Sequence, residues 1–313
     1  MKNECIEILP RSYNKYKINL HTHSTFSDGN FTPEELKRIY MKEGYSAVAF
    51  TDHRECISHN ELTDDEFVAL TGTELDFTLL SDAGWVDCVH INALSREPDK
   101  RRSYEKMPLD YELINKTVDE LRRDNFFVTV NHPVWSNMSS DDVLRIKGAD
   151  AIEIVNGIGV VFNNYSDDSA HYEYFIRKGG RAVPVAGDDS HKIFEDGTPY
   201  HEYCTTFTTV FAKELSYGAI IDALDAGRSY ASTGPRFESI RLVGDKLCVE
   251  CSNVFGVYVH SKYLTLKTQD VRKTDSITYT EIDISDIRAK SPYFWVSIRD
   301  TKGGKAWATP YWF

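Results

Sequence analysis

The stretch from residue 18 to residue 53 constrains the fold of this chain most strongly. Two short apolar runs, residues 18–20 and 47–50, each end in polar side chains that can bind metals or phosphates. The polar residues after these runs are His21, His23, Asp28, Asp52 and His53. Alternate residues of a strand share a face, so His21 and His23 can point the same way and reach one cation. We expect both strands to end at one site.

The residues between these two runs predict a helix. Thr32-Pro-Glu-Glu35 reads as a capping box with Pro33 at the first helical position. Leu36, Ile39 and Tyr40 then form an apolar stripe at helical spacing that stops at Gly44. Strand, helix and strand together fit one βαβ unit.

Strand and helix patterns continue to alternate up to about residue 235. The expected strands are residues 70–75, 87–94, 126–130, 151–155, 182–186 and 205–211, and the expected helices are residues 111–124, 168–178 and 216–226. Repeated β then α indicates a parallel sheet, and at 313 residues a closed or nearly closed barrel.

From Phe237 the sequence changes to short alternating runs broken by turn residues, with KGGK at residues 302–305 as a hairpin signal. We expect two domains: a barrel over residues 1–236 and a small antiparallel β domain, a sandwich or a lid, over residues 237–313.

Charge and composition limit the classes of molecule that this protein can bind. Lys and Arg number 36 against 48 Asp and Glu, a net charge of −12, so the surface should repel long nucleic acids and anionic membranes. No apolar run approaches the roughly 18 residues of a membrane helix, and Glu4, Glu7 and Pro10 lie where a signal peptide has its apolar core. We expect a cytoplasmic protein with six free cysteines, because the one close pair, Cys248 and Cys251, faces opposite sides of a strand.

HTHSTFSDG at residues 21–29, followed by TDH at residues 51–53, resembles the signature of the PHP (polymerase and histidinol phosphatase) family, in its CehA/McbA-like subgroup. The resemblance covers roughly residues 17–236. It implies a distorted (βα)7 TIM-like barrel and metal-dependent hydrolysis. Two departures stand out: Arg54 follows TDH where many relatives have a small polar residue, and the later motif reads GDDSH where relatives often have GNDSH. Asp189 therefore adds negative charge beside the site.

The resemblance also implies two or three divalent cations, and mixed nitrogen and oxygen ligands suit Mn, Fe or Zn. It places His21, His23, Glu74 and Asp188 at the first metal, Glu74 as a bridge with His90 and His132 at the second, and Asp28, His53 and His191 at the third. His90 lies inside an apolar run and has a second reading as a hydrogen-bonded core histidine. Asp52 is either a partner that orients a ligand histidine or a cap.

Other segments are candidates for contact with substrate. Arg236 and Gly234 lie in GRSYASTGPR and could bind phosphate, or could form a turn between the two domains. Asn156 ends a predicted strand, and His201 could donate a proton to the leaving group or simply be an exposed loop residue. We read His59, His171 and His260 as structural or solvent-facing.

These features predict a phosphoesterase that hydrolyses a small phosphorylated metabolite or nucleotide, with Glu74, Asp188 and His201 as catalytic residues and with water activated by metal as the nucleophile. Hydrolysis of a carbamate, ester or amide is the alternative, and a non-catalytic metal-binding interaction protein is the third reading. No P-loop, nucleophile elbow or glycine fingerprint occurs. No feature of the sequence sets an oligomeric state.

Overall fold

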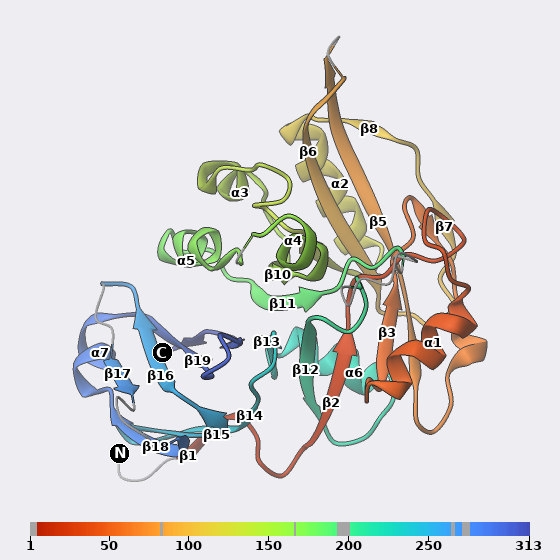
Figure 1. Ribbon diagram of the computed structural model, residues 1–313. Coiled ribbons are helices and arrows are strands. Elements are labelled where there is room, and N and C mark those ends of the chain that lie inside the picture. Colours follow the sequence, from red (N-terminus) through yellow and green to blue (C-terminus); the bar gives the residue numbers. More distant parts are fainter. Residues whose placement is uncertain (1–4, 82–83, 166, 193–200, 264–266, 271–275) are drawn as a thin grey trace.

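The structure is a computed structural model that describes residues 5–81, 84–165, 167–192, 201–263, 267–270 and 276–313. It is a mixed α/β fold (Figure 1). Its helices are α1 (Pro33–Lys42), α2 (Tyr111–Arg123), α3 (Ser140–Arg145), α4 (Gly157–Phe162), α5 (Ser169–Arg177), α6 (Tyr217–Asp225) and α7 (Ser285–Lys290), with a 3-10 turn at Asn60–Leu62.

The helix predicted between the first two strands is confirmed. Thr32 accepts a hydrogen bond from the Glu35 N–H and the Glu35 side chain accepts one from the Thr32 N–H, so both halves of the capping box are present. Leu36 and Tyr40 are buried on the inner face of α1. Gly44 follows with a φ of 76°, a left-handed conformation that glycine adopts without strain.

One large sheet of 15 strands dominates the molecule. Its order is β11-β10-β9-β6-β5-β3-β2-β12-β13-β20-β19-β16-β17, with β8 beside β5 and β21 beside β19. The strands on the side of the first βαβ unit are β2 (Asn14–Asn19), β3 (Ala47–Phe50), β5 (Val68–Ser81), β6 (Gly84–Ser95), β8 (Met107–Pro108), β9 (Phe126–Val130), β10 (Ala151–Asn156), β11 (Val183–Gly187), β12 (Phe207–Ala212) and β13 (Ser229–Ser232).

This sheet is not the uniformly parallel one that the sequence predicted. Strands β2, β3 and β5 are parallel, as are β9, β10 and β11, but β6 runs antiparallel to both β5 and β9. Strands β5 and β6 pair directly with each other without a helix among the described residues between them, and this long antiparallel pair projects from the molecule (Figure 1). Strand β12 is likewise antiparallel to β2.

The edges at β11 and β12 meet without a backbone ladder among the described residues. The Thr208 hydroxyl joins them instead: it accepts from the Ala186 N–H at 2.9 Å and lies 3.0 Å from the Ala186 carbonyl oxygen. The strands therefore curve around an interior, but a closed barrel of backbone hydrogen bonds is not formed there.

Hydrogen bonding crosses the expected boundary at Phe237 in both directions. Strand β20 (Lys305–Ala308) pairs with β13, so the C-terminal strands continue the large sheet. Strand β1 (Cys5–Leu9) pairs with β14 (Phe237–Val243) in a separate four-stranded sheet, so β1 packs with strands that follow the expected boundary. The remaining strands are β15 (Lys246–Val254), β16 (Gly256–Ser261), β17 (Lys267–Asp270), β18 (Ile277–Asp283), β19 (Tyr293–Arg299) and β21 (Tyr311–Trp312), with β4 (Glu55–Cys56) and β7 (Arg102–Ser103) as a small pair.

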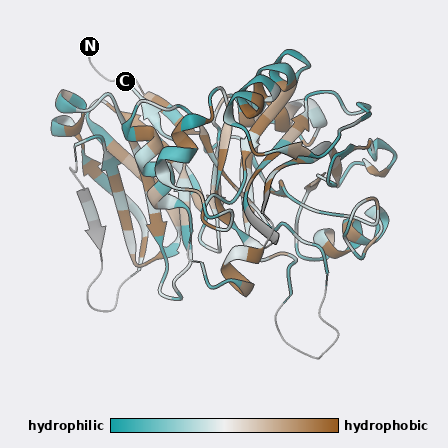
Figure 2. Ribbon diagram, turned by 90° about the horizontal axis from the view of Figure 1, so that it is seen from above, coloured by the Kyte–Doolittle hydropathy of each residue, from teal (hydrophilic) through white to brown (hydrophobic). Residues whose placement is uncertain are grey.

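The hydrophobic core also extends across that boundary. Leu36, Tyr40 and Val48 belong to the same buried cluster as Ile240 and Val257. Apolar residues concentrate along the strands, and polar residues lie mostly on the outer loops and helix faces (Figure 2). Residues 237–313 thus share core packing with the part of the chain that precedes them.

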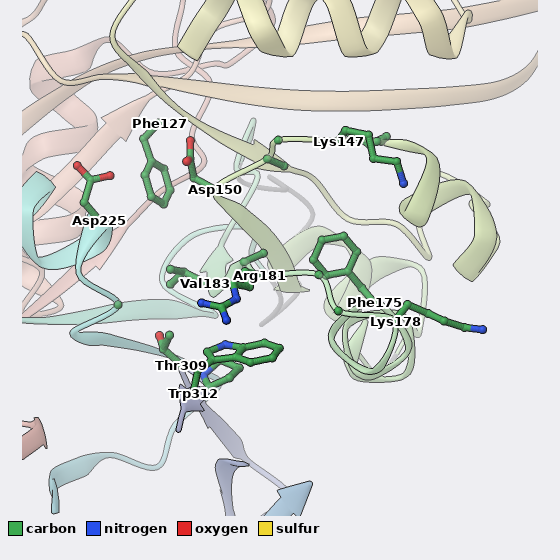
Figure 3. A pocket seen from close by; sticks show the side chains of 18 of the residues that line it. Phe127, Lys147, Asp150, Phe175, Lys178, Arg181, Val183, Asp225, Thr309 and Trp312 are labelled. Carbon is green, nitrogen blue, oxygen red and sulfur yellow. The ribbon is translucent and has the colours of Figure 1, made fainter. Parts of the chain in front are cut away.

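A large open cavity of about 750 Å³ lies at the beginning of β9, β10 and β11 (Figure 3). Phe127, Asp150, Val183, Arg181 and Trp312 are among its lining residues. His132 and His191 follow the opposite ends of β9 and β11, so this cavity is remote from both histidines.

All six cysteines are free. Among the described residues, no helix has both the length and the apolar character that a membrane span requires.

Candidate metal centre

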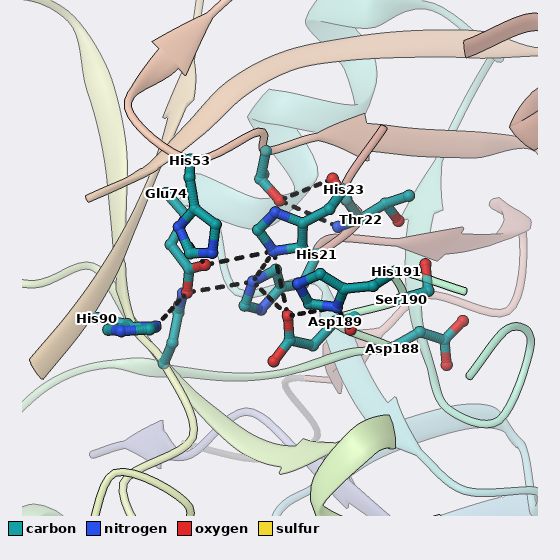
Figure 4. Close-up of polar contacts among 12 residues, drawn as sticks. His21, Thr22, His23, His53, Glu74, His90, Asp188, Asp189, Ser190 and His191 are labelled. Atoms are coloured by element: carbon teal, nitrogen blue, oxygen red, sulfur yellow. Dashed lines mark hydrogen bonds and ion pairs between the residues drawn. The ribbon is translucent and has the colours of Figure 1, made fainter. Parts of the chain in front are cut away.

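Histidines and carboxylates converge where several strands of the large sheet end (Figure 4). They form overlapping groups in which the nitrogen and oxygen atoms lie within 4.8 Å of one another. The members are His21 and His23 after β2, Asp28 in the next loop, His53 after β3, Glu74 on β5, His90 on β6, His132 after β9, Glu153 on β10, and Asp189 and His191 after β11.

His21, His23, Glu74 and Asp189 form the first group, and all four residues are buried. The Nε2 atoms of His21 and His23 lie 3.3 Å apart, and each lies 3.1 to 3.2 Å from Asp189 Oδ1. Glu74 supplies Oε1 at 3.2 Å from His21 Nε2 and Oε2 at 3.3 Å from His23 Nε2. Four ligands held tetrahedrally at about 2.0 to 2.1 Å from a cation are about 3.3 Å from one another. The group therefore has the spacing of a metal site.

Glu74 also belongs to a second group, with His90 and His132. Its Oε1 atom lies 3.1 Å from His90 Nδ1 and 3.4 Å from His132 Nε2. The Asn131 amide donates to the same oxygen at 2.7 Å, which fixes the carboxylate between the two groups. Glu74 thus lies within reach of both groups.

The third group is closer to the surface and contains His23, Asp28, His53 and His191. The Asp28 carboxylate lies 3.7 Å from His53 Nε2 and 3.6 Å from His191 Nε2. Its side chain is 56% exposed, so this group is the most open to solvent of the three.

Hydrogen bonds on the far side of three rings fix their orientation. His21 Nδ1 lies 3.2 Å from Glu153 Oε1, His132 Nδ1 lies 3.0 Å from Ser136 Oγ, and His191 Nδ1 lies 2.8 Å from the Asp189 carbonyl oxygen. Each ring thereby turns its Nε2 atom toward the cluster, which is how partners beyond the ligands orient histidine at metal sites. Glycine at position 187 permits this packing, since a Cβ there would lie 2.4 Å from His21 Cβ.

The chemistry of the donor set fits divalent cations. Among the described residues, His23 Nδ1, His53 Nδ1 and His132 Nε2 are buried without a hydrogen-bond partner. Buried polar atoms are normally satisfied, and three unsatisfied ring nitrogens in one cluster indicate a missing partner that accepts their lone pairs. Imidazole nitrogens together with carboxylate oxygens suit Mn, Fe or Zn.

The charges of the cluster are strongly coupled. Burial alone would lower the pKa of His21 and His23, but the carboxylates of Asp189 and Glu74 outweigh it, and the pKa of His23 rises to about 9. Despite burial, the neighbouring histidines hold the pKa values of Glu74 and Asp189 well below their usual range. Burial lowers the pKa of His53 to about 4, so this ring is neutral at physiological pH.

The expectation that Asp188 binds metal is corrected by the structure. Its carboxylate points away from the histidine cluster (Figure 4) and accepts hydrogen bonds from Tyr40 Oη at 2.9 Å and from the Cys204, Thr205 and Thr206 N–H groups at 2.7 to 3.0 Å. Asp189 occupies the position beside His21, His23 and Glu74 that was expected for Asp188. Asp188 therefore serves the packing of residues 204–206 and not the cluster.

The candidate substrate residues are placed differently from the expectation. Asn156 is buried at the site, but its amide nitrogen lies 3.0 Å from Glu153 Oε2 and 3.2 Å from Asp189 Oδ2, so it supports these carboxylates. Arg236 and Gly234 are exposed, and the Arg236 backbone is tied to Ser252. His201 is exposed and belongs to none of the groups of possible metal ligands in the described part of the chain.

The remaining candidates have structural contacts. Asp52 accepts hydrogen bonds from Ser24 and Ser27 and so holds the loop that carries Asp28, rather than orienting a histidine ring. His171 bonds to the Met138 carbonyl oxygen, and His260 stacks on Trp295 with ring centroids 3.9 Å apart. His59 is buried beside Phe50.

Glu153 was missed from the sequence. It lies in the apolar run AIEIVN, where a buried acidic residue needs a partner, and that is the signal that could have identified it. Asp189 also had a signal, because the GNDSH of the relatives carries its aspartate at this position. The carboxylate that GDDSH adds is therefore that of Asp188, and the expectation that Asp189 adds the charge is corrected.

No family model and no curated protein matches the chain. Three solved structures are similar to it at low identity. One is a two-domain protein from Bacteroides vulgatus described as containing a predicted PHP-like metal-dependent phosphoesterase; it is 18% identical, covers 100% of this chain and 98% of its own, and has a TM-score of 0.46.

The second is an amidohydrolase from Chromobacterium violaceum with bound sulfate, 16% identical over 57% of this chain and 89% of its own, with a TM-score of 0.42. The third, from Bifidobacterium adolescentis, carries the provisional name of metal-dependent phosphoesterase and is 14% identical over 67% of this chain and 96% of its own, with a TM-score of 0.40. All three TM-scores lie below 0.5, so these likenesses do not establish an activity for the chain.

Proposed function

We propose that this chain is a metal-dependent hydrolase of the PHP type. The observation that carries the proposal is the convergence of six histidines with Asp28, Glu74 and Asp189 at the ends of strands, with three buried ring nitrogens that have no hydrogen-bond partner among the described residues. The sequence motif HTHSTFSDG followed by TDH supports the same assignment. Within this proposal, the curved strands correspond to the distorted (βα)7 barrel and residues 237–313 to a small β domain packed against it.

Two or three divalent cations would be held by three sets of residues. His21, His23, Glu74 and Asp189 would hold the first, Glu74, His90 and His132 the second, and Asp28, His53 and His191 the third. Such cations supply Lewis acidity, which lowers the pKa of water and stabilises negative charge that develops on a phosphoryl or carbonyl oxygen.

The chain itself contributes fixed geometry. Glu153 and Ser136 orient the rings of His21 and His132, and Asn131 holds the Glu74 carboxylate between two groups. The low pKa of His53 keeps this ring in the neutral form that a ligand requires. Asp28 lies at the solvent side, so substrate would enter from the third group.

Phosphate esters are our first choice of substrate and carbamates, carboxyl esters or amides the second. Arg236 was the cation expected to bind phosphate. Its side chain is exposed and its backbone N–H is bonded to Ser252, so we do not assign it to the site, and this favours the second choice. Arg54, which follows the TDH motif, forms an ion pair with Asp76 and is committed to that carboxylate. In that case the metal ions alone would neutralise the negative charge of a phosphate substrate. A small-molecule substrate and a cytoplasmic location remain part of the proposal.

A matched substrate screen tests the proposal. The full chain, stripped of metal and reconstituted with Mn, Fe or Zn, is assayed on phenyl phosphate, bis(4-nitrophenyl) phosphate, phenyl acetate and an aryl carbamate. We expect metal-dependent hydrolysis of at least one class that is lost in Asp189→Ala. Tight metal binding without hydrolysis of any substrate would favour the non-catalytic reading.

A further inference from the structure

The cavity of about 750 Å³ at the beginning of β9, β10 and β11 is large enough for a small organic molecule (Figure 3). Its volume lies within the roughly 300 to 1,000 Å³ of ordinary small-molecule sites. None of the described residues that line it belongs to a group of possible metal ligands, and His132 and His191 follow the opposite ends of β9 and β11. An occupant of this cavity would therefore not contact the proposed metal centre.

The charge of the cavity wall is opposite to that of the whole chain. The chain carries a net charge of −12. Among the described residues, the lining has four cationic side chains, Arg122, Lys147, Lys178 and Arg181, against two carboxylates, Asp150 and Asp225. A cavity with more cations than carboxylates in an acidic protein favours an anionic occupant.

Both carboxylates of the lining are already paired. Asp150 Oδ1 lies 3.5 Å from Arg122 Nη2, and Asp225 accepts two hydrogen bonds from the Arg96 guanidinium at 2.6 and 3.0 Å. The other three cations of the lining have no carboxylate partner among the described residues. Their positive charge is therefore available to a ligand.

Arg181 is held by an aromatic ring and not by a carboxylate. Its guanidinium carbon lies 4.4 Å from the centroid of the Trp312 ring, and the two groups lie together in the middle of the cavity (Figure 3). The Trp312 ring packs in turn against Tyr293, with ring centroids 4.7 Å apart. Stacking holds a guanidinium by its face and leaves the N–H groups at its edges free to bind an anion. Arg181 thus presents donors that no described residue accepts from.

Apolar side chains form other parts of the same cavity wall. Ile146 and Val183 are buried in the lining, and Phe175 is half-buried. The Phe175 ring packs against the backbone of Gly180, where an added Cβ would lie 2.3 Å from the ring. A ligand can therefore place an apolar body against these side chains while its charged group reaches Arg181.

We propose that this cavity is a binding site for an organic anion that carries a planar apolar ring. Arg181 recognises the anionic group through its N–H edges, and Phe175 and the outer face of the guanidinium contact the ring. A neutral ring would lose the charge-assisted hydrogen bond, and an anion without a ring would lose the apolar contact. The site is separate from the proposed hydrolase site and does not depend on that function.

Titration calorimetry on the metal-loaded full chain tests the site with three probes. Naphthalenesulfonate has both ring and charge, methanesulfonate lacks the ring, and naphthalenemethanol lacks the charge. We expect naphthalenesulfonate to bind at about one molecule per chain and at least about tenfold more tightly than either of the others, because it alone gains both contacts. No saturable binding of naphthalenesulfonate below about 1 mM, or an affinity equal to that of naphthalenemethanol, would overturn the proposal.

Variants locate the bound probe. Arg181→Gln, at an exposed position, should weaken naphthalenesulfonate binding at least about tenfold, and Arg181→Lys, which keeps the charge without the planar group, should lie between this variant and wild type. Trp312→Leu should weaken binding at least about threefold, because the guanidinium loses the ring that holds it. Arg102→Gln is the matched control, since Arg102 also lies over an aromatic ring, that of Tyr104 at 4.9 Å, but does not line the cavity. Unchanged affinity in Arg181→Gln, or an equal loss in Arg102→Gln, would refute the site.

Metal removal separates this site from the metal centre. Naphthalenesulfonate affinity should stay within about twofold when the metal is stripped by a chelator, because no lining residue is a proposed ligand. Loss of binding in the metal-free protein would place the probe at the metal centre and overturn the proposal. Failure of the hydrolase proposal shows instead in metal content and ester hydrolysis, which are measured in separate assays.

Discussion

Asp188 and Asp189 are neighbours in the chain, yet their carboxylates lie in different surroundings. Asp189 Oδ1 is 3.1 Å from His23 Nε2, whereas Asp188 Oδ2 accepts a hydrogen bond from Tyr40 Oη at 2.9 Å. A φ of 55° at Asp189 turns the backbone between them. One carboxylate thereby joins the proposed metal ligands and the other supports a loop.

Replacement of each residue by alanine should therefore affect a different property: metal binding for Asp189 and stability for Asp188. Asp189→Ala should lose bound metal but keep most of its stability, because it removes a charge from a site of crowded ligands. Asp188→Ala should lower the free energy of unfolding by about 3 to 5 kcal/mol, since it leaves buried N–H and hydroxyl donors without an acceptor. Denaturant unfolding and metal analysis of both variants check this, and metal loss in a fully stable Asp188→Ala protein would contradict it.

Metal binding should release protons and strengthen as pH rises. Neighbouring carboxylates outweigh burial and raise the pKa of His23 to about 9, and of His90 to about 10, in the metal-free protein. Both rings are protonated at pH 7, so a cation must displace protons to bind them. Calorimetry in buffers of different ionisation enthalpy measures the release.

The stability of the metal-free protein should fall as pH rises, whereas metal binding strengthens. The pKa values of His23 and His90 are raised on folding, so their contribution is full below pH 6.5, the ordinary histidine value, and is lost as pH rises through about 9 to 10. Melting temperatures with and without metal should diverge between pH 6.5 and 9. A constant difference over that range would count against this charge assignment.

Arg236→Ala should have little effect on either substrate class. The side chain is exposed, and its backbone N–H is bonded to Ser252 Oγ at 2.9 Å. We expect kcat/KM for phenyl phosphate and phenyl acetate to change less than about twofold, in the range of a neutral surface substitution. A loss of kcat/KM on phenyl phosphate alone would contradict this and indicate that Arg236 contacts the substrate.

Removal of residues 237–313 should unfold the rest of the chain. Strand β13 would lose its partner β20, and β1 would lose β14. Leu36, Tyr40 and Val48 would lose buried apolar neighbours on the C-terminal strands. Expression as an insoluble or unfolded product, judged by circular dichroism, is the expected result; a folded, metal-binding fragment would show that the two parts are independent.

Local sequence patterns predicted the first βαβ unit and most members of the histidine and carboxylate cluster. The capping box at Thr32 and Glu35 and the alternation of His21 and His23 depend on residues close together in the chain, so their geometry follows from the sequence. Strand-end positions likewise pointed to His132 and His191.

Features set by distant contacts were not predictable in the same way. The direction of the Asp188 carboxylate depends on Tyr40, 148 residues away, and on the donors of residues 204–206. The antiparallel course of β6 depends on its pairing with β9 as well as with β5. The pairing of β20 with β13 joins segments that the alternating pattern alone assigned to different domains.

The metal content of Glu74→Gln tests the central claim most directly. Glu74 contacts His21 and His23 in one group and His90 and His132 in the next, so a neutral amide at this position should weaken both. Wild type and Glu74→Gln are reconstituted with Mn, Fe or Zn, desalted and analysed for metal per chain, with Glu281→Gln on the exposed sheet as the control. We predict two or three ions in wild type and in the control, and loss of at least two in Glu74→Gln together with hydrolysis. Retention of the same metal content in Glu74→Gln, or no bound metal in wild type, would contradict the assignment of this cluster as a metal centre.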